Sequence, residues 1–218
     1  MPASAELENF VKTLHYMADR FGEMGEALSE APSRDTFAVQ LEQLNLLKMG
    51  VDLAFGRTDP TAKDAFAYKK VYNWTFAEFA ADFDKVFNLA APKLSLFEHD
   101  WPIAVLKDAP DSVARMTSWV QIMRVMPQSF ALPVDHLASE LGLAEYVFNT
   151  VAERSEDTDE AYVVAKEYAD ANLLWVARLK PAVEGLEDGP VKEMMRLYIE
   201  VIENWEAVFK GYQALLAR

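Results

Sequence analysis

The stretch LPVDHLASELGLAEYVF, residues 132–148, decides the fold that this sequence predicts. Pro133 suits the first position of a helix, where its missing N–H costs nothing. From there the apolar side chains recur at steps of three and four residues, which is the period of one apolar helix face; they are Leu137, Leu141, Ala144, Phe148 and Val151. We therefore expect a helix from Pro133 to about Arg154, with Asp135 and His136 side by side in its exposed first turn.

Nearly every other apolar pattern in the chain has the same helical period, and we find no strand–turn–strand signature. A capping box that begins at Thr75 and a cap at Asp111 mark the starts of two further helices. The sequence predicts an all-α fold of about seven to nine helices in one domain, residues 1–218. Besides the helix above, the expected helices cover residues 4–29, 35–55, 75–89, 111–126, 157–180 and 190–216.

A short loop that contains two prolines, MPQSFALP at 126–133, divides this pattern in two. Proline disfavours the helical conformation in the residue before it, so we expect the chain to leave the helix there. We interpret the loop as a hinge between two packed lobes. The N-terminal lobe would cover about 1–126 and the C-terminal lobe about 133–218.

The composition restricts the classes of partner. The chain has 35 Asp and Glu against 21 Lys and Arg, a formal net charge of −14. It should therefore repel nucleic acid and anionic lipid and attract basic segments, although the same charge is also explained by solubility alone. There is no cysteine, which excludes disulfides, iron–sulfur ligation and thiolate zinc sites and fits a reducing compartment.

Sequence signals of export, membrane insertion and catalysis are lacking. No apolar run of about 18 residues predicts a membrane span, and the N-terminus lacks the basic and apolar regions of a secretory signal. Neither Gly-x-Ser-x-Gly nor a Gly-rich phosphate loop occurs, so we predict no catalytic residue. His136 and Glu140 are four residues apart, an acceptable spacing for two metal ligands. A metal- or ligand-dependent helical enzyme that uses His136, Glu140 and Asp135 is therefore one alternative, although we expect no metal.

The segment around Asp135 resembles the Pro-x-Asp-His-(Leu/Phe)-x-x-x-Leu signature of the TorD/DmsD/NarJ family of redox-enzyme maturation chaperones, matched here by residues 133–141. KVFNLAAP at 85–92 and YADANLLWVARL at 168–179 are similar to two further segments of that family. Leu132 stands where the family often has Glu, and Asn172 stands where it has His. The resemblance spans roughly residues 70–180, and only the part at 133–141 is specific.

This resemblance implies an all-α, TorD-like fold and a cytoplasmic protein that is not an enzyme and carries no cofactor. Its partners would be the N-terminal leader, often of twin-arginine type, and the apo form of a molybdopterin-containing oxidoreductase subunit. The chaperone would hold that subunit during cofactor insertion, before export. Members of the family can exchange lobes, so we expect either a monomer or a lobe-swapped dimer. A structural helical adaptor is a further alternative.

A leader is an apolar stretch behind a basic head, so its receptor needs an apolar groove with an acidic mouth. In the family, the Asp-His pair lines the leader-binding region, which puts Asp135 and His136 there by resemblance. Aromatic side chains are candidates for the wall of the groove, and carboxylates are candidates for its mouth. The expected leader-binding residues are Pro133, Asp135, His136, Glu140, Tyr72, Trp74, Phe97, Glu98, Asp100 and Trp101.

Overall fold

The computed structural model describes residues 5–59, 67–87, 92–101, 111–125, 132–154 and 157–216. Over these residues the chain is helical and has no strand, which confirms the all-α prediction and the expected range of helices. The α-helices are α1 (Ala5–Ser29), α2 (Arg34–Ala54), α3 (Phe76–Phe87), α4 (Ser112–Met123), α5 (Leu137–Arg154), α6 (Thr158–Asn172), α7 (Lys180–Glu184), α8 (Pro190–Glu203) and α9 (Trp205–Leu216). Two short 3-10 helices, η1 (Glu98–Asp100) and η3 (Leu174–Leu179), join them.

Side-chain caps start the helices where the sequence indicates. Glu78 accepts hydrogen bonds from the backbone N–H of Thr75 at 2.8 Å, and the N–H of Glu78 donates to the Thr75 hydroxyl at 3.2 Å. This reciprocal pair is the predicted capping box. Asp111 accepts from the N–H of Ala114 at 2.7 Å, which confirms the second predicted cap.

Three predicted helix limits are wrong. The helix expected from Pro133 begins only at Leu137, because residues before it pair with another segment. The helix expected over 157–180 ends at Asn172 and continues as η3. The last helix, expected as 190–216, breaks at Asn204, whose amide donates back to the Glu200 carbonyl at 2.9 Å.

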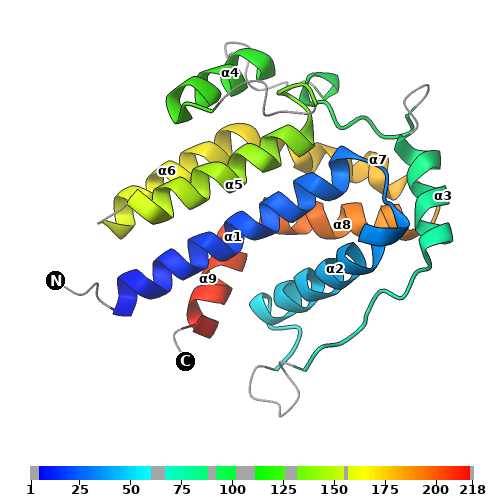
Figure 1. Cartoon of the computed structure of the whole chain (residues 1–218), viewed down its shortest axis with the longest axis horizontal. Coiled ribbons are helices and arrows are strands. Elements are labelled where there is room, and N and C mark those ends of the chain that lie inside the picture. Colours follow the sequence, from blue (N-terminus) through cyan, green and yellow to red (C-terminus); the bar gives the residue numbers. More distant parts are fainter. Residues whose placement is uncertain are drawn as a thin grey trace.

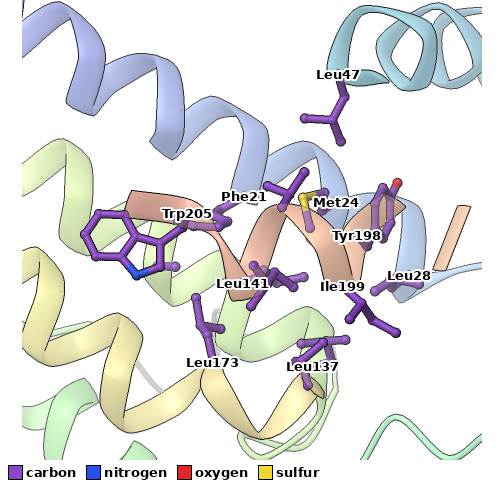
Figure 2. Packing of buried hydrophobic residues seen from close by; sticks show 14 of the residues in the cluster. Phe21, Met24, Leu28, Leu47, Leu137, Leu141, Leu173, Tyr198, Ile199 and Trp205 are labelled. Carbon is purple, nitrogen blue, oxygen red and sulfur yellow. The ribbon is translucent and has the colours of Figure 1, made fainter. Parts of the chain in front are cut away.

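The helices surround one buried apolar cluster. In Figure 1, α1 runs beside α5, α6 follows on the outer side of α5, and α4 lies over these two helices. Helix α8 contacts α3, α7 and η3, and α9 closes against α1 and α2. Figure 2 shows side chains from α1, α2, α5, α8 and α9 in the same cluster, among them Phe21, Leu47, Leu141, Ile199 and Trp205. The expected apolar face of α5 is buried along its whole length. Within the described ranges, no helix is both long enough and apolar enough to cross a membrane.

Most of the predicted hinge loop, residues 126–131, lies outside the described residues. Helices from the two sides of it pack on each other, as α1 does on α5, α2 on α9 and α3 on α8. The chain therefore builds its buried cluster from both of the expected lobes. The boundary between the lobes and the lobe-swapped dimer stay predictions.

The contact between α1 and α5 is the most extensive between any two helices, and a glycine sets its closeness. A Cβ atom at Gly25 would lie 3.0 Å from the carbonyl oxygen of Ala138 and 3.2 Å from the Cβ of Leu141. Because one of these atoms is backbone, a side chain at Gly25 would push the helices apart. A Cβ at Gly142, which also lies on this side of α5, would meet nothing within 4 Å.

We predict that Gly25→Leu lowers the free energy of unfolding by roughly 1–3 kcal/mol, since it overpacks the α1–α5 contact. Gly142→Ala should raise it by roughly 0.5–1 kcal/mol, because alanine favours a helix interior and finds open space there. Urea unfolding of both variants measures these changes. An equal response at the two glycines would contradict the close packing of α1 on α5.

Candidate functional site

The start of α5 is held by a short backbone pairing with the segment that leads into η1. The N–H of Leu137 donates to the carbonyl of Leu96 at 2.8 Å, and the N–H of Glu98 donates to the carbonyl of Asp135 at 3.0 Å. Phe97 and His136 thereby form an isolated antiparallel bridge. This pairing satisfies backbone groups that a helix starting at Pro133 would have used internally.

Asp135 is buried, with only 3% of its surface exposed. Its carboxylate accepts hydrogen bonds from Nδ1 of His99 at 2.5 Å and from the hydroxyl of Ser112 at 3.3 Å. The hydrogen bond to Asp135 raises the pKa of His99, whose other face is open to solvent. Asp135 therefore joins η1 and the first residue of α4 to the start of α5.

His136 is buried as well and caps α5. Its Nδ1 accepts from the backbone N–H of Ala138 at 3.1 Å, which requires the neutral ring with its proton on Nε2. The edge of the ring lies against Phe97, with centroids 5.0 Å apart. Burial lowers the pKa of His136 to about 4, and the nearby Asp135 carboxylate opposes this shift only in part.

Glu140 lies one turn further along α5 and has no exposed surface. Its Oε2 accepts from the indole N–H of Trp175 at 2.6 Å, and its other oxygen has no conventional hydrogen-bond partner. Burial raises the pKa of Glu140 well above its usual range, and the neighbouring Glu98 carboxylate raises it further. The buried site therefore favours the protonated, neutral form of Glu140.

Arg115 completes this buried group of polar residues. Its guanidinium forms an ion pair with Glu98 and donates to the side-chain carbonyl of Asn172 at 3.0 Å. Asn172 in turn donates to the carbonyl of Tyr168 at 2.9 Å. Residues of η1, α4, α5 and α6 are thus tied together by hydrogen bonds from side chains that are buried or nearly so.

The structure brings most of the predicted site residues together. Phe97, Glu98, Asp135, His136 and Glu140 form the group just described, and Pro133 and Asp100 lie at its exposed edge. The indole N–H of Trp101 donates to the carbonyl of Ser95 at 3.1 Å in the same segment.

Tyr72 and Trp74 belong to a different part of the fold. Their rings stack 4.5 Å apart, and Trp74 also contacts Phe79 of α3. The backbone of Tyr72 is bound on both sides by the side chain of Asn45 in α2. Asn45 therefore holds the segment before α3 on α2, and the ring of Trp74 lies against α3.

The expectation of an exposed Asp-His pair is wrong, because both side chains are buried and bonded to their own chain. The sequence pattern identified the right residues but placed the helix start four residues too early. Buried groups whose hydrogen bonds are made internally hold a structure in place and are not free for a ligand. A direct contact of Asp135 or His136 with a peptide stays a prediction.

A groove lies beside this anchored helix start, and we call it the α1–α5 groove. It has a volume of about 1000 Å³ and is lined by α1, by the end of α4 and by α5 from Ala138 to Arg154. Leu132, Ala138 and Ser139 of the sequence motif region contribute to its wall. Gly22, Gly25 and Gly142 also line it, and of these only Gly142 borders open space, because a Cβ there would meet nothing within 4 Å.

The α1–α5 groove is strongly acidic. Its carboxylates are those of Asp19, Glu23, Glu26, Glu145 and Glu153, against the guanidinium groups of Arg124 and Arg154. Glu145 lies directly against α1 at Gly22, where a Cβ would come within 2.5 Å of the carboxylate carbon. Burial and the charges of Asp19 and Glu26 raise its pKa. Burial also raises the pKa of Glu23, although an ion pair with Arg20 at 2.6 Å opposes the shift.

Sequence reasoning missed this groove, although part of its signal was visible. Asp19, Glu23 and Glu26 recur at steps of four and three residues, which places them on one face of α1. What the sequence does not show is that α5 presents Glu145 to the same face, since that depends on how the two helices pack.

The described residues contain no group of three or more His, Asp or Glu side chains arranged to hold a metal ion. Comparison of the chain with protein-family models, with curated proteins and with solved structures gives no match. The family resemblance therefore rests on the residues quoted above.

We predict that His136→Asn removes a pH dependence of stability. The folded-state pKa of His136 is about 4, below the ordinary value of 6.5, so the unfolded chain binds the proton more readily between these values. The stabilisation that comes from the neutral His136 ring is fully present above about pH 6.5 and is lost as the pH falls toward 4. Asparagine keeps the cap without titrating. Urea unfolding at pH 7 and pH 4.5 should show a smaller loss in the variant than in the wild-type chain, and identical losses would contradict a buried neutral imidazole.

We also predict that Glu140→Gln is tolerated at pH 7, whereas Glu140→Ala lowers the free energy of unfolding by roughly 1–3 kcal/mol. Glutamine is neutral like the protonated acid and keeps an oxygen that accepts from Trp175, but alanine leaves the indole N–H unpaired. Because the pKa of Glu140 is higher in the folded state, wild-type stability falls as the pH rises from about 4.5 through that pKa. The glutamine variant should lack this fall, and a loss as large as that of alanine would show that Glu140 is ionised.

Proposed function

We propose that this protein is a chaperone of the TorD/DmsD/NarJ type. It is a cytoplasmic, non-enzymatic protein that binds the N-terminal leader of a molybdopterin-containing oxidoreductase subunit. It holds the apo subunit while the cofactor is inserted and so delays export. The proposal is supported by the sequence motif at 133–141 and by the groove that lies beside it.

The observation that carries the proposal is the excess of carboxylates in the α1–α5 groove. A leader of twin-arginine type begins with a basic head, and such a head needs acceptors that are already in place. Glu145, Asp19 and Glu26 repel one another in the free protein, which is one reason why the pKa of Glu145 is raised. A bound guanidinium group relieves this repulsion, so the groove favours a cationic ligand over a neutral one.

In this account the buried residues of the motif act indirectly. Asp135, His136 and Glu140 fix where α5 begins and which way it faces. Helix α5 then presents Glu145 and Glu153 to the groove from a rigid base. A site held on helices is positioned more precisely than one held on loops.

Binding of a basic leader should release protons from the protein. Glu145 and Glu23 have raised pKa values in the free protein, and a cationic ligand stabilises their charged forms. The affinity of the leader therefore increases as the pH rises through these pKa values. It falls with added salt, because part of the attraction is between exposed charges.

The test is calorimetric titration with a synthetic peptide of about 20 residues that has two adjacent arginines followed by an apolar run. We expect binding that weakens with salt, and a peptide with glutamines in place of the arginines should bind less tightly. Glu26→Lys, in the groove, should weaken binding roughly three- to tenfold, because it reverses a nearby charge. Glu42→Lys, an exposed glutamate on α2, is the matched control and should change little.

Absence of binding at high micromolar peptide would contradict the proposal. Equal effects of Glu26→Lys and Glu42→Lys would contradict the assignment of the α1–α5 groove. Equal affinity for the arginine peptide and the glutamine peptide would favour the alternative of a structural helical adaptor with a different kind of partner.

A further inference from the structure

The stretch AYKKV, residues 67–71, differs in charge from the rest of this acidic chain, and we call it the lysine segment. It contains the one pair of adjacent basic residues in the sequence, Lys69 and Lys70, and no carboxylate. Both lysines are exposed. Their neighbours Tyr68 and Val71 are exposed as well, with 49% and 50% of their surfaces in water. The lysine segment therefore presents cationic and apolar groups together to solvent.

One end of the lysine segment is fixed on α2. Asn45 of α2 has no exposed surface, and its side-chain oxygen accepts from the N–H groups of Val71 at 2.6 Å and of Tyr72 at 2.7 Å. Its side-chain amide donates to the carbonyl of Tyr72 at 3.1 Å. In Figure 1 the stretch between α2 and α3 runs along the edge of the molecule opposite to α4. The lysine segment therefore lies on a different face from the α1–α5 groove of its own chain, and its docking elsewhere costs less conformational entropy than that of a free segment.

The α1–α5 groove is complementary to the lysine segment in charge and in apolar surface. Its carboxylates, described above, come from α1 and α5 and outnumber its two arginines. The side chains of Val125, Leu132 and Tyr146 add apolar surface to the same lining. The groove has a volume of about 1000 Å³, enough for several side chains. It therefore offers acceptors for ammonium groups beside contacts for an aromatic or aliphatic side chain.

The net charge of the chain restricts how two copies can meet. Each copy has a formal net charge of −14, so two copies repel each other over most of their surfaces. A contact is favourable only where basic groups of one copy meet acidic groups of the other. At about 0.1 M salt the Debye length is about 10 Å, which screens the repulsion between whole molecules but leaves attraction at direct contact. The lysine segment and the α1–α5 groove supply such a contact.

We propose that the lysine segment of one copy of this chain docks in the α1–α5 groove of a second copy. The contact joins two different surfaces, so every copy offers one segment and one groove. This inference rests on the proposed function for the cation preference of the groove, and it adds a regulation of that site: a second copy covers the groove while no leader is bound. An arginine head displaces the lysine segment, because guanidinium groups bind carboxylates through two parallel hydrogen bonds and an ammonium group acts as a point charge.

The test is sedimentation velocity of the whole chain at high micromolar concentration in about 0.1 M salt. The wild-type chain should associate, and a segment variant with both Lys69→Glu and Lys70→Glu should weaken association roughly tenfold. The groove variant Glu26→Lys should also weaken it, because it places a cation where the lysines dock. The matched controls make the same changes of charge at exposed positions outside the lysine segment and the groove. They are Lys12→Glu with Lys210→Glu, and Glu167→Lys.

Mixing the two variants separates a specific contact from a loss of fold. The segment variant keeps an intact groove, and Glu26→Lys keeps an intact lysine segment. An equimolar mixture should therefore form a dimer of one copy of each, although neither variant associates alone. This recovery also shows that both variants are folded. The arginine-containing peptide should dissociate the wild-type assembly, because it occupies the same groove.

A wild-type chain that stays monomeric at high micromolar concentration would overturn this inference, and so would variants that associate as strongly as their controls. A mixture that does not recover would overturn it too. The proposed function is judged separately, by titration of dilute wild-type protein with the peptide. If the peptide binds but the chain does not associate, this inference fails and the proposed function stands. If the chain associates through the groove but the peptide does not bind, the proposed function fails and the contact between copies stands.

Discussion

The first turn of α5 is the point on which the rest of the structure depends. Three polar side chains are buried at or beside it, namely Asp135 before α5, Glu140 in α5 and Glu98 in η1. Each is held by a partner from a different part of the chain: Asp135 by His99, Glu140 by Trp175, and Glu98 by Arg115. The net contribution of one such hydrogen bond to stability is modest, but leaving a buried polar group unpaired costs roughly 1–3 kcal/mol. The helix start is therefore specified by the high cost of any other arrangement. This is why residues that resemble a binding motif occupy positions closed to solvent.

A fixed helix start determines what the other faces of α5 present. On one face, Gly25 lets α1 approach closely, and Gly22 leaves room for the carboxylate of Glu145. The carboxylates of the two helices are thereby brought together at a groove of about 1000 Å³. At the end of α4, Ile122 is left largely exposed to solvent. Acidic side chains of α1 and α5 thus gather on one face of the molecule, where they attract a cationic group.

The helical period of the apolar residues was sufficient to predict the all-α fold and the buried face of α5, because helices of this chain bury one stripe each. It was also sufficient for the caps at Thr75 and Asp111, which are local. It failed at Pro133, where pairing with Leu96 and Glu98, distant in sequence, overrides the local preference for a helix. For the candidate site too, local patterns were visible in the sequence and contacts between distant segments were not. Glu98 and Glu140 were found from the sequence, but the exposure of Asp135 and the opposition of Glu145 to α1 depend on packing between helices.

The most direct test of this account is the exchange of backbone amide hydrogens with deuterium, followed by mass spectrometry, with and without the arginine-containing peptide. The account predicts that the peptide slows exchange in α1 around residues 19–29 and in α5 around residues 142–154, and leaves residues 95–101 unchanged, because those are already bonded to the start of α5. Slower exchange confined to residues 95–101 and 132–136 would contradict it. That result would place the ligand on the Asp135–His136 pair itself.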